Sequence, residues 1–199
     1  MNDGAWAGRG PNANSRVIER HAVLEDMLDE WSPALGPARA AYAGHAYRVY
    51  NLARSVLGSS RGDDELAVAS AYHDLGIWSD RTFDYLAPSI ARAEGYLRTR
   101  ASAALAPLVR ELIANHHALR RIRGGIAPDL AEAFRRADLV DVTGSLYRAG
   151  LDRGFLRELV AVFPYAGFHG VLARAAWSWF LKHPLNPLPM LRVSGSSKP

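Results

Sequence analysis

Leu66-Ala-Val-Ala-Ser-Ala-Tyr-His-Asp-Leu-Gly76 is a run of small and apolar residues that contains His73 and Asp74 next to each other. Leu66, Ala69 and His73 recur at the three-four spacing that places side chains on one face of a helix. Burying an imidazole and a carboxylate there costs on the order of several kcal/mol unless they are paired or bind a metal ion. The run therefore predicts a buried helix that carries a metal-binding or ion-paired His-Asp group.

Three further segments place a histidine or an aspartate on an apolar helical face. In addition to the pair His73–Asp74, these residues are His45, His116 with His117, and Asp138 with Asp141. The order along the chain is therefore His, His-Asp, His, Asp. A divalent ion bound by neutral imidazoles and carboxylates would offset the cost of burying these polar groups. The structural alternative is that Asp74 or Asp141 pairs with Arg48 or Arg136.

Apolar residues recur with a helical period through most of the chain, and no strand alternation, βαβ pattern or internal repeat interrupts them. This predicts an all-α, single-domain bundle of about seven to nine helices. The domain is expected over residues 14–192, with Ser15 as the first N-cap, and 1–13 and 193–199 as flexible tails. The helical segments are expected near 15–31, 37–57, 63–77, 86–100, 103–118, 128–143, 152–163 and 167–182.

Composition narrows the chemistry of any site. The 199 residues include no cysteine, which excludes disulfides, thiolate ligands and a cysteine nucleophile. The chain has 24 basic and 20 acidic residues, and almost all of the basic residues are arginine. The basic residues are dispersed along the chain, which argues against nucleic-acid binding. The first residues lack an apolar signal-peptide core, and no apolar run reaches the length of a membrane span. A cytoplasmic protein is expected.

Between residues 42 and 144 the chain resembles the HD-domain superfamily of metal-dependent phosphohydrolases. The resemblance rests on His45-Ala-Tyr-Arg-Val-Tyr50, on the apolar helix ending in His-Asp-Leu-Gly, and on Ala137-Asp138. It implies that four residues hold one divalent ion, namely His45, His73, Asp74 and Asp138. Asp141 is the alternative to Asp138 as the fourth ligand, because the two aspartates share a helical face.

The number and kind of ions are less closely specified. HD enzymes with two irons generally supply two well-separated histidines between the His-Asp pair and the final aspartate, whereas His116 and His117 are adjacent and would point about 100° apart on a helix. One ion is therefore favoured over two. His169 and His183 are remote spare ligands. A His2Asp2 set suits Mn, Fe, Zn, Co or Ni.

The resemblance favours a hydrolase that attacks a small phosphorylated molecule or nucleotide with metal-activated water. Asp74 and Arg48 belong to the catalytic centre, where the arginine would take up developing negative charge, and His116 or His117 is expected to protonate the leaving group. Arginines near these residues would bind an anionic substrate, although those at 120–123 also fit a solvated surface. The substrate-binding residues expected are Arg48, Trp78, Arg81, Tyr85 and Arg120, with Arg121 as an alternative.

Three other functions fit the same residues. A hydratase similar to cyanamide hydratase would add water to a small nitrile in an aromatic pocket around Trp78, Phe83 and Tyr85. The second alternative function is a di-iron oxygenase, and the third is a non-catalytic binding protein. The aromatic stretch from Phe163 to Met190 is expected to pack in the core, with closure over the substrate and a homodimer contact as alternatives.

Overall fold

The computed structural model of the chain describes residues 16–191, which form an all-α domain. Eight helices have nine or more residues, in agreement with the predicted bundle, and no strand occurs among the residues described. The helices are α1 (Ala22–Glu30), α2 (Ser32–Leu35), α3 (Arg39–Leu57), α4 (Asp63–Tyr72), α5 (Gly76–Ser79), α6 (Leu86–Thr99), α7 (Ala106–Asn115), α8 (Pro128–Val142), α9 (Arg153–Val162) and α10 (Phe168–Lys182), with 3-10 turns at Gly36–Ala38, Ala103–Leu105 and Pro189–Leu191.

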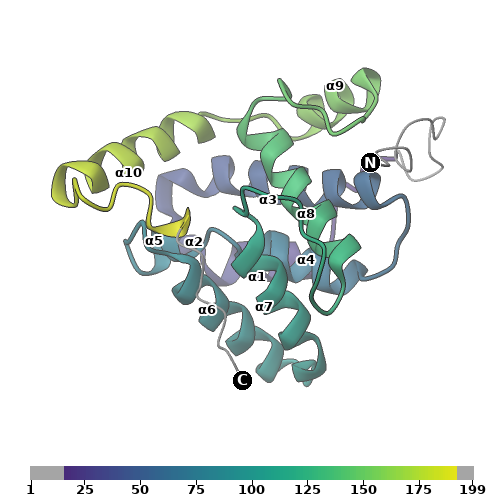
Figure 1. Cartoon of the computed structure of the whole chain (residues 1–199), viewed down its shortest axis with the longest axis horizontal. Helices are drawn as coiled ribbons and strands as arrows, with labels where there is room; N and C mark the ends of the chain where they lie inside the picture. The colour runs from purple at the N-terminus through teal and green to yellow at the C-terminus, as the bar shows by residue number, and fades with distance from the viewer. Residues whose placement is uncertain (1–15, 192–199) are drawn as a thin grey trace.

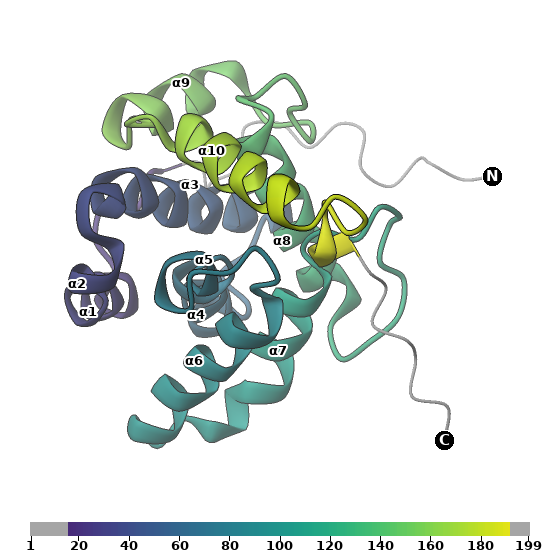
Figure 2. The ribbon, with the colours of Figure 1, turned by 90° about the vertical axis from the view of Figure 1, so that its left-hand side faces the viewer.

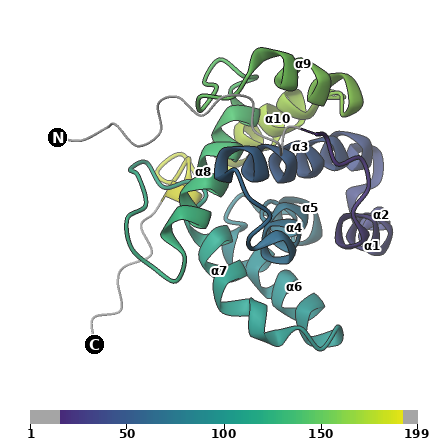
Figure 3. The ribbon, with the colours of Figure 1, turned by 90° about the vertical axis from the view of Figure 1, so that its right-hand side faces the viewer.

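Helix α3 runs through the middle of the molecule (Figure 1). It packs along α8 and against α4, and α4 in turn contacts α1, α6 and α7. Figures 2 and 3 show α9 and α10 on one side of α3, and α6 with α7 on the other side of α4. Because α3, α4, α7 and α8 meet in the interior, all the segments predicted to carry a metal-binding histidine or aspartate reach the same region.

Most predicted helix limits agree with the structure, and three helices differ; the helix expected over 103–118 is α7, which covers only Ala106–Asn115. The first helix begins at Ala22 rather than near residue 15, and the Nδ1 atom of His21 accepts a hydrogen bond from the Val23 backbone N–H as its N-cap. The expected cap, Ser15, lies outside the described residues, as do both predicted tails. The helix expected over 63–77 ends at Tyr72 and resumes as the single turn α5.

The break after Tyr72 brings a distant loop close to the site. The Gly76 backbone N–H donates to the Ser89 hydroxyl at 3.0 Å, and a Cβ at Gly76 would lie 2.7 Å from the Tyr85 carbonyl oxygen. Only glycine permits this approach, because real Cβ contacts are not that short. Gly76 therefore lets the chain around Tyr85 pack directly beside the His-Asp pair.

Candidate metal centre

His45 and His73 meet at the centre of the bundle. Their Nε2 atoms lie 2.9 Å apart, and both side chains are completely buried. The sequence placed them on different helices 28 residues apart, and α3 and α4 bring them together. Two nitrogens each about 2.0–2.1 Å from one ion can be separated by at most about 4 Å, so this pair is close enough to share an ion.

Two carboxylates complete this end of the cluster. Asp74 Oδ2 lies 3.5 Å from His45 Nε2 and 3.7 Å from His73 Nε2. Asp138 Oδ1 lies 3.8 and 3.6 Å from the same two atoms. These distances are longer than ordinary hydrogen bonds, yet they keep the oxygens and nitrogens around one point.

The far sides of the rings fix which nitrogen carries a proton when the imidazole is neutral. His45 Nδ1 faces the Asp141 carboxylate at 2.8 Å, His73 Nδ1 faces the Ser70 carbonyl at 3.1 Å, and His116 Nδ1 faces the Ile113 carbonyl at 2.7 Å. Each partner only accepts hydrogen bonds, so each Nδ1 must donate. The three Nε2 atoms therefore present lone pairs to one another and to the carboxylates.

When these imidazoles are neutral, the interior of the cluster is lined by hydrogen-bond acceptors. Asp74 Oδ1, His116 Nε2 and Asp138 Oδ1 are buried without any hydrogen-bond partner. Leaving such atoms unsatisfied costs about 1–3 kcal/mol each, and more when they are charged. A divalent ion or bound protons would satisfy them, and imidazole nitrogen with carboxylate oxygen is a donor set that binds transition metals. The residues present therefore fit a metal ion.

A second group of potential ligands shares Asp74. Its Oδ1 atom lies 3.5 Å from His116 Nε2, and Asp74, His116 and His117 each offer a ligand atom within 4.8 Å of the others. Among the described residues, the other such group is His45, His73 and Asp74. Asp74 thus turns one oxygen toward each group, which is the arrangement of a carboxylate between two ions.

The expectation that only one of His116 and His117 could face the site was wrong. It assumed that both residues continue an ideal helix, but α7 ends at Asn115 and His116 is its C-cap. The chain then turns, and the two imidazole rings lie 3.9 Å apart. His117 also turns Nδ1 toward Asp138 Oδ2 at 3.9 Å, so both histidines face the carboxylates.

Arg48 and Asp141 lie behind His45 rather than at the centre of the cluster. Arg48 Nε donates to Asp141 Oδ1 at 2.5 Å and Nη2 donates to Asp141 Oδ2 at 3.0 Å, while Nη1 donates to the carbonyls of Phe163 and Pro164. The guanidinium is 1% exposed. The expected Arg48–Asp141 alternative pairing therefore exists, and the arginine has protein partners where a substrate anion was expected.

Burial and charge shift the pKa values of the cluster in opposite directions. Burial alone would lower the pKa of His45, but its hydrogen bonds with Asp141 and Asp74 raise it to about 9. Burial would raise the pKa of Asp138, yet His73 and the neighbouring imidazoles lower it to about 2. Burial and the charge of His116 lower the pKa of His117 to about 4. The carboxylates stay ionised and attract a cation.

Metal binding is expected to release protons. With a pKa near 9, His45 in the metal-free protein holds a proton at pH 7 that an incoming ion must displace. Apparent affinity for Mn²⁺ should therefore fall about tenfold for each pH unit lowered below 9, because one proton competes at that site. Calorimetric titrations at pH 6, 7 and 8, in two buffers of different ionisation enthalpy, measure both affinity and proton release. An affinity that does not change with pH would contradict this.

The other predicted substrate-binding residues occupy three different settings. Tyr85 is buried, and its hydroxyl lies 2.5 Å from His117 Nε2. Trp78 packs edge-on against Tyr42 in the main core. Arg81 is exposed beside a cavity under α10, and Arg120, Arg121 and Arg123 are exposed on the loop after α7. Tyr85 is the predicted substrate-binding residue that directly contacts the His/Asp cluster.

Sequence reasoning expected the aromatic stretch from Phe163 to Met190 to pack in the core, but it did not predict that the start of this stretch covers the back of His45. The Phe168 ring stacks on the His45 ring at 4.0 Å, the Tyr165 ring lies 4.2 Å from the Arg48 guanidinium, and His169 Nε2 donates to the Asp141 carbonyl. The aromatic content of this segment was the available signal. Only its position in the fold shows that it supports the cluster. Neither His169 nor His183 joins either group of potential ligands among the described residues.

Comparison with models of known protein families, with curated proteins and with solved structures finds no match to this chain. The resemblance to HD-domain enzymes therefore rests on the residues themselves and on the buried His/Asp cluster that they form. Within residues 16–191, no helix is both long enough and apolar enough to cross a lipid bilayer.

Proposed function

We propose that this chain is a metal-dependent hydrolase of the HD type that acts on a small phosphorylated molecule or nucleotide. The observation that carries the proposal is that Asp74 belongs to both groups of potential ligands, in a buried cluster where several nitrogen and oxygen atoms have no hydrogen-bond partner. Paired ions of this kind clamp the attacking and leaving oxygens of a phosphate ester. The proposal replaces the single ion expected from the sequence with two.

Six residues would hold the ions. His45, His73 and Asp138 would hold one, His116 and His117 the other, and Asp74 would bind both. Bound divalent ions lower the pKa of coordinated water and polarise the phosphorus–oxygen bond under attack. Asp138 is preferred over Asp141 as a ligand because Asp138 Oδ1 lacks a hydrogen-bond partner, whereas both Asp141 oxygens have one.

Substrate would reach the cluster from the side of His117. Its side chain is 24% exposed, whereas those of Asp74 and Asp138 are 4% and 5% exposed. The Tyr85 hydroxyl holds the His117 ring from the other edge. Because its pKa is about 4, His117 is neutral at pH 7 and suits a ligand or proton acceptor better than the acid expected from the sequence.

Hydration of a small nitrile is the second candidate, and the arginines favour it. Arg48 is bound by Asp141 and two carbonyls, and the remaining candidates Arg81 and Arg120 are exposed. No ion pair joins an arginine to Asp74 or Asp138 within the described part of the chain. A neutral substrate would not need such a partner, whereas a phosphate would depend on the ions alone.

A substrate screen with metal-loaded protein separates these functions. The protein is loaded with Mn²⁺, Fe²⁺, Zn²⁺, Co²⁺ or Ni²⁺ and assayed with phosphomonoesters, nucleotides and cyanamide. We expect phosphate release, reduced on the order of a thousandfold in His73→Ala because the ions' contribution of several kcal/mol is lost. The carboxylate variant Asp80→Asn, which alters an exposed ion pair with Arg92, serves as the control.

Each other outcome assigns a different function. Cyanamide hydration without phosphate release would replace the proposal with the hydratase. Oxygen consumption by the iron-loaded protein would favour the oxygenase, for which two ions are also required. A purified protein that retains no stoichiometric metal would favour a binding protein.

A further inference from the structure

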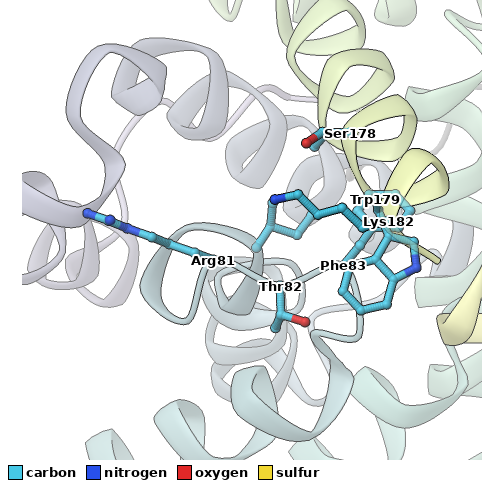
Figure 4. Close-up of a pocket in the computed structure, with 8 residues that line it drawn as sticks. Arg81, Thr82, Phe83, Ser178, Trp179 and Lys182 are labelled. Carbon is cyan, nitrogen blue, oxygen red and sulfur yellow. The ribbon is translucent and has the colours of Figure 1, made fainter.

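A small cavity lies between the loop after α5 and helix α10 (Figure 4). Its volume is about 210 Å³, below the range of roughly 300–1,000 Å³ typical of sites for drug-sized ligands, so it suits a single ring with a small substituent. The lining residues are Ile77, Arg81, Thr82, Phe83, Ala175, Ser178, Trp179 and Lys182.

One wall of the cavity is a fixed aromatic surface. Trp179 donates from Nε1 to the Asn186 carbonyl at 2.8 Å, and its ring lies against the His183 ring, tilted by 31°, with centroids 3.9 Å apart. Phe83, 8% exposed, belongs to the same apolar cluster as Trp179 and Ile77. A ligand ring entering the cavity would therefore meet aromatic faces that are already held in place, which reduces the entropy lost on binding.

Two cations line the same cavity. Figure 4 shows the Lys182 side chain extending from α10 across the cavity, and the Arg81 guanidinium directed away from the other lining residues. No carboxylate of the described residues lies within ion-pair distance of either cation. Their charges are therefore available to a ligand, with Lys182 already placed over the cavity.

Arg81 is one of five non-glycine residues with a positive φ angle among the described residues. Its φ angle is +53°, in the left-handed region, although it is not glycine. A non-glycine residue is unfavourable in this region, and such residues are found more often at ligand-binding sites. Arg81 therefore contributes a strained residue to the lining of the cavity, while its guanidinium points away from the other lining residues.

We propose that this cavity binds a small planar anion, such as an aromatic carboxylate or aryl phosphate. The ring would pack against Trp179 and Phe83, and the anionic group would accept hydrogen bonds from Lys182. The Phe83 ring lies 6.0 Å from the Tyr85 ring, and Tyr85 contacts His117, so one aromatic layer separates this site from the His/Asp cluster. The proposal does not depend on the hydrolase function.

Calorimetric titration of the full-length protein with benzoate and phenylphosphonate tests the site, with neutral benzamide as the matched ligand. Both anions should bind more tightly than benzamide. Lys182→Met should weaken both anions about tenfold, as expected for loss of one charge-assisted hydrogen bond, and leave benzamide unchanged. Trp179→Leu should weaken all three ligands. Arg174→Met removes another exposed cation of α10, outside the cavity lining, and should change nothing.

A chelator distinguishes this site from the metal centre. Binding should persist after EDTA treatment, whether or not the hydrolase proposal holds. The proposal is overturned if neither anion shows saturable binding, if benzamide binds as well as benzoate, or if EDTA abolishes binding. It is also overturned if Arg174→Met weakens the anions as much as Lys182→Met.

Discussion

Replacing Asp74 with asparagine is expected to reduce bound metal from about two ions per chain to nearly none. Asp74 turns Oδ2 toward His45 and His73 and Oδ1 toward His116, so it is the residue shared by both groups of potential ligands. An amide keeps the shape but removes the negative charge and one acceptor. Metal content of the full-length protein, measured after purification with and without added Mn²⁺, provides the test.

Three further variants calibrate that result. Asp80→Asn makes the same chemical change at an exposed ion pair and should retain both ions. Asp138→Asn should lose the ion held with His45, whereas Asp141→Asn should retain it at reduced affinity. Retention in Asp138→Asn with loss in Asp141→Asn would reverse the two assignments. Full metal content in Asp74→Asn would contradict the shared role of this carboxylate.

The parts of the fold that the sequence predicted are those set by periodicity. The apolar faces of α3 and α4 identified His45 and His73 as inward residues, and both are completely buried. Helix limits were predicted well where glycine or proline marks an end, as at Gly58 after α3 and Pro128 at the start of α8. The prediction failed at Tyr72, where the helix gives way to a hydrogen-bonded turn next to Gly76, which packs closely against a distant loop.

The candidate site was less predictable because its details depend on directions that an ideal helix does not give. His116 and His117 face the same carboxylates only because α7 ends just before them. Lys182 and Trp179 reach a cavity beside Arg81 only because α10 folds back over the loop after α5. No periodic pattern links residues that are about 100 positions apart.

Arg48 shows how a correct local inference can mislead. It lies one turn from His45 and shares its side of the helix, which suggested contact with substrate. The side chain instead reaches past His45 to Asp141, whose carboxylate also receives the His45 Nδ1–H. Gly44 permits this arrangement, because a Cβ there would lie 2.7 Å from the Pro164 carbonyl oxygen and 2.8 Å from Arg48 Nη1. We infer that Arg48 positions His45 through Asp141.

Replacing Arg48 with methionine is therefore expected to lower the free energy of unfolding by about 3–5 kcal/mol, because the buried Asp141 carboxylate loses its two hydrogen bonds from the guanidinium and keeps only that from His45. Urea denaturation of the metal-free protein measures this loss. Arg61→Met is the matched control, since Arg61 pairs with Asp129 at the surface and its removal should cost less than about 1 kcal/mol. Equal stabilities of the two variants would contradict a buried, structural role for Arg48.

A double variant separates stability from positioning. Adding Asp141→Leu to Arg48→Met removes the buried carboxylate that has lost its arginine, and stability should recover because apolar groups can replace a buried ion pair with little or no loss. The His45 ring would then lack the carboxylate that holds its Nδ1–H, and second partners of this kind contribute about 10–100-fold to metal affinity. A stable protein that binds Mn²⁺ about 10–100-fold more weakly would show that Asp141 orients the ligand. Unchanged affinity would limit the Arg48–Asp141 pair to a role in folding.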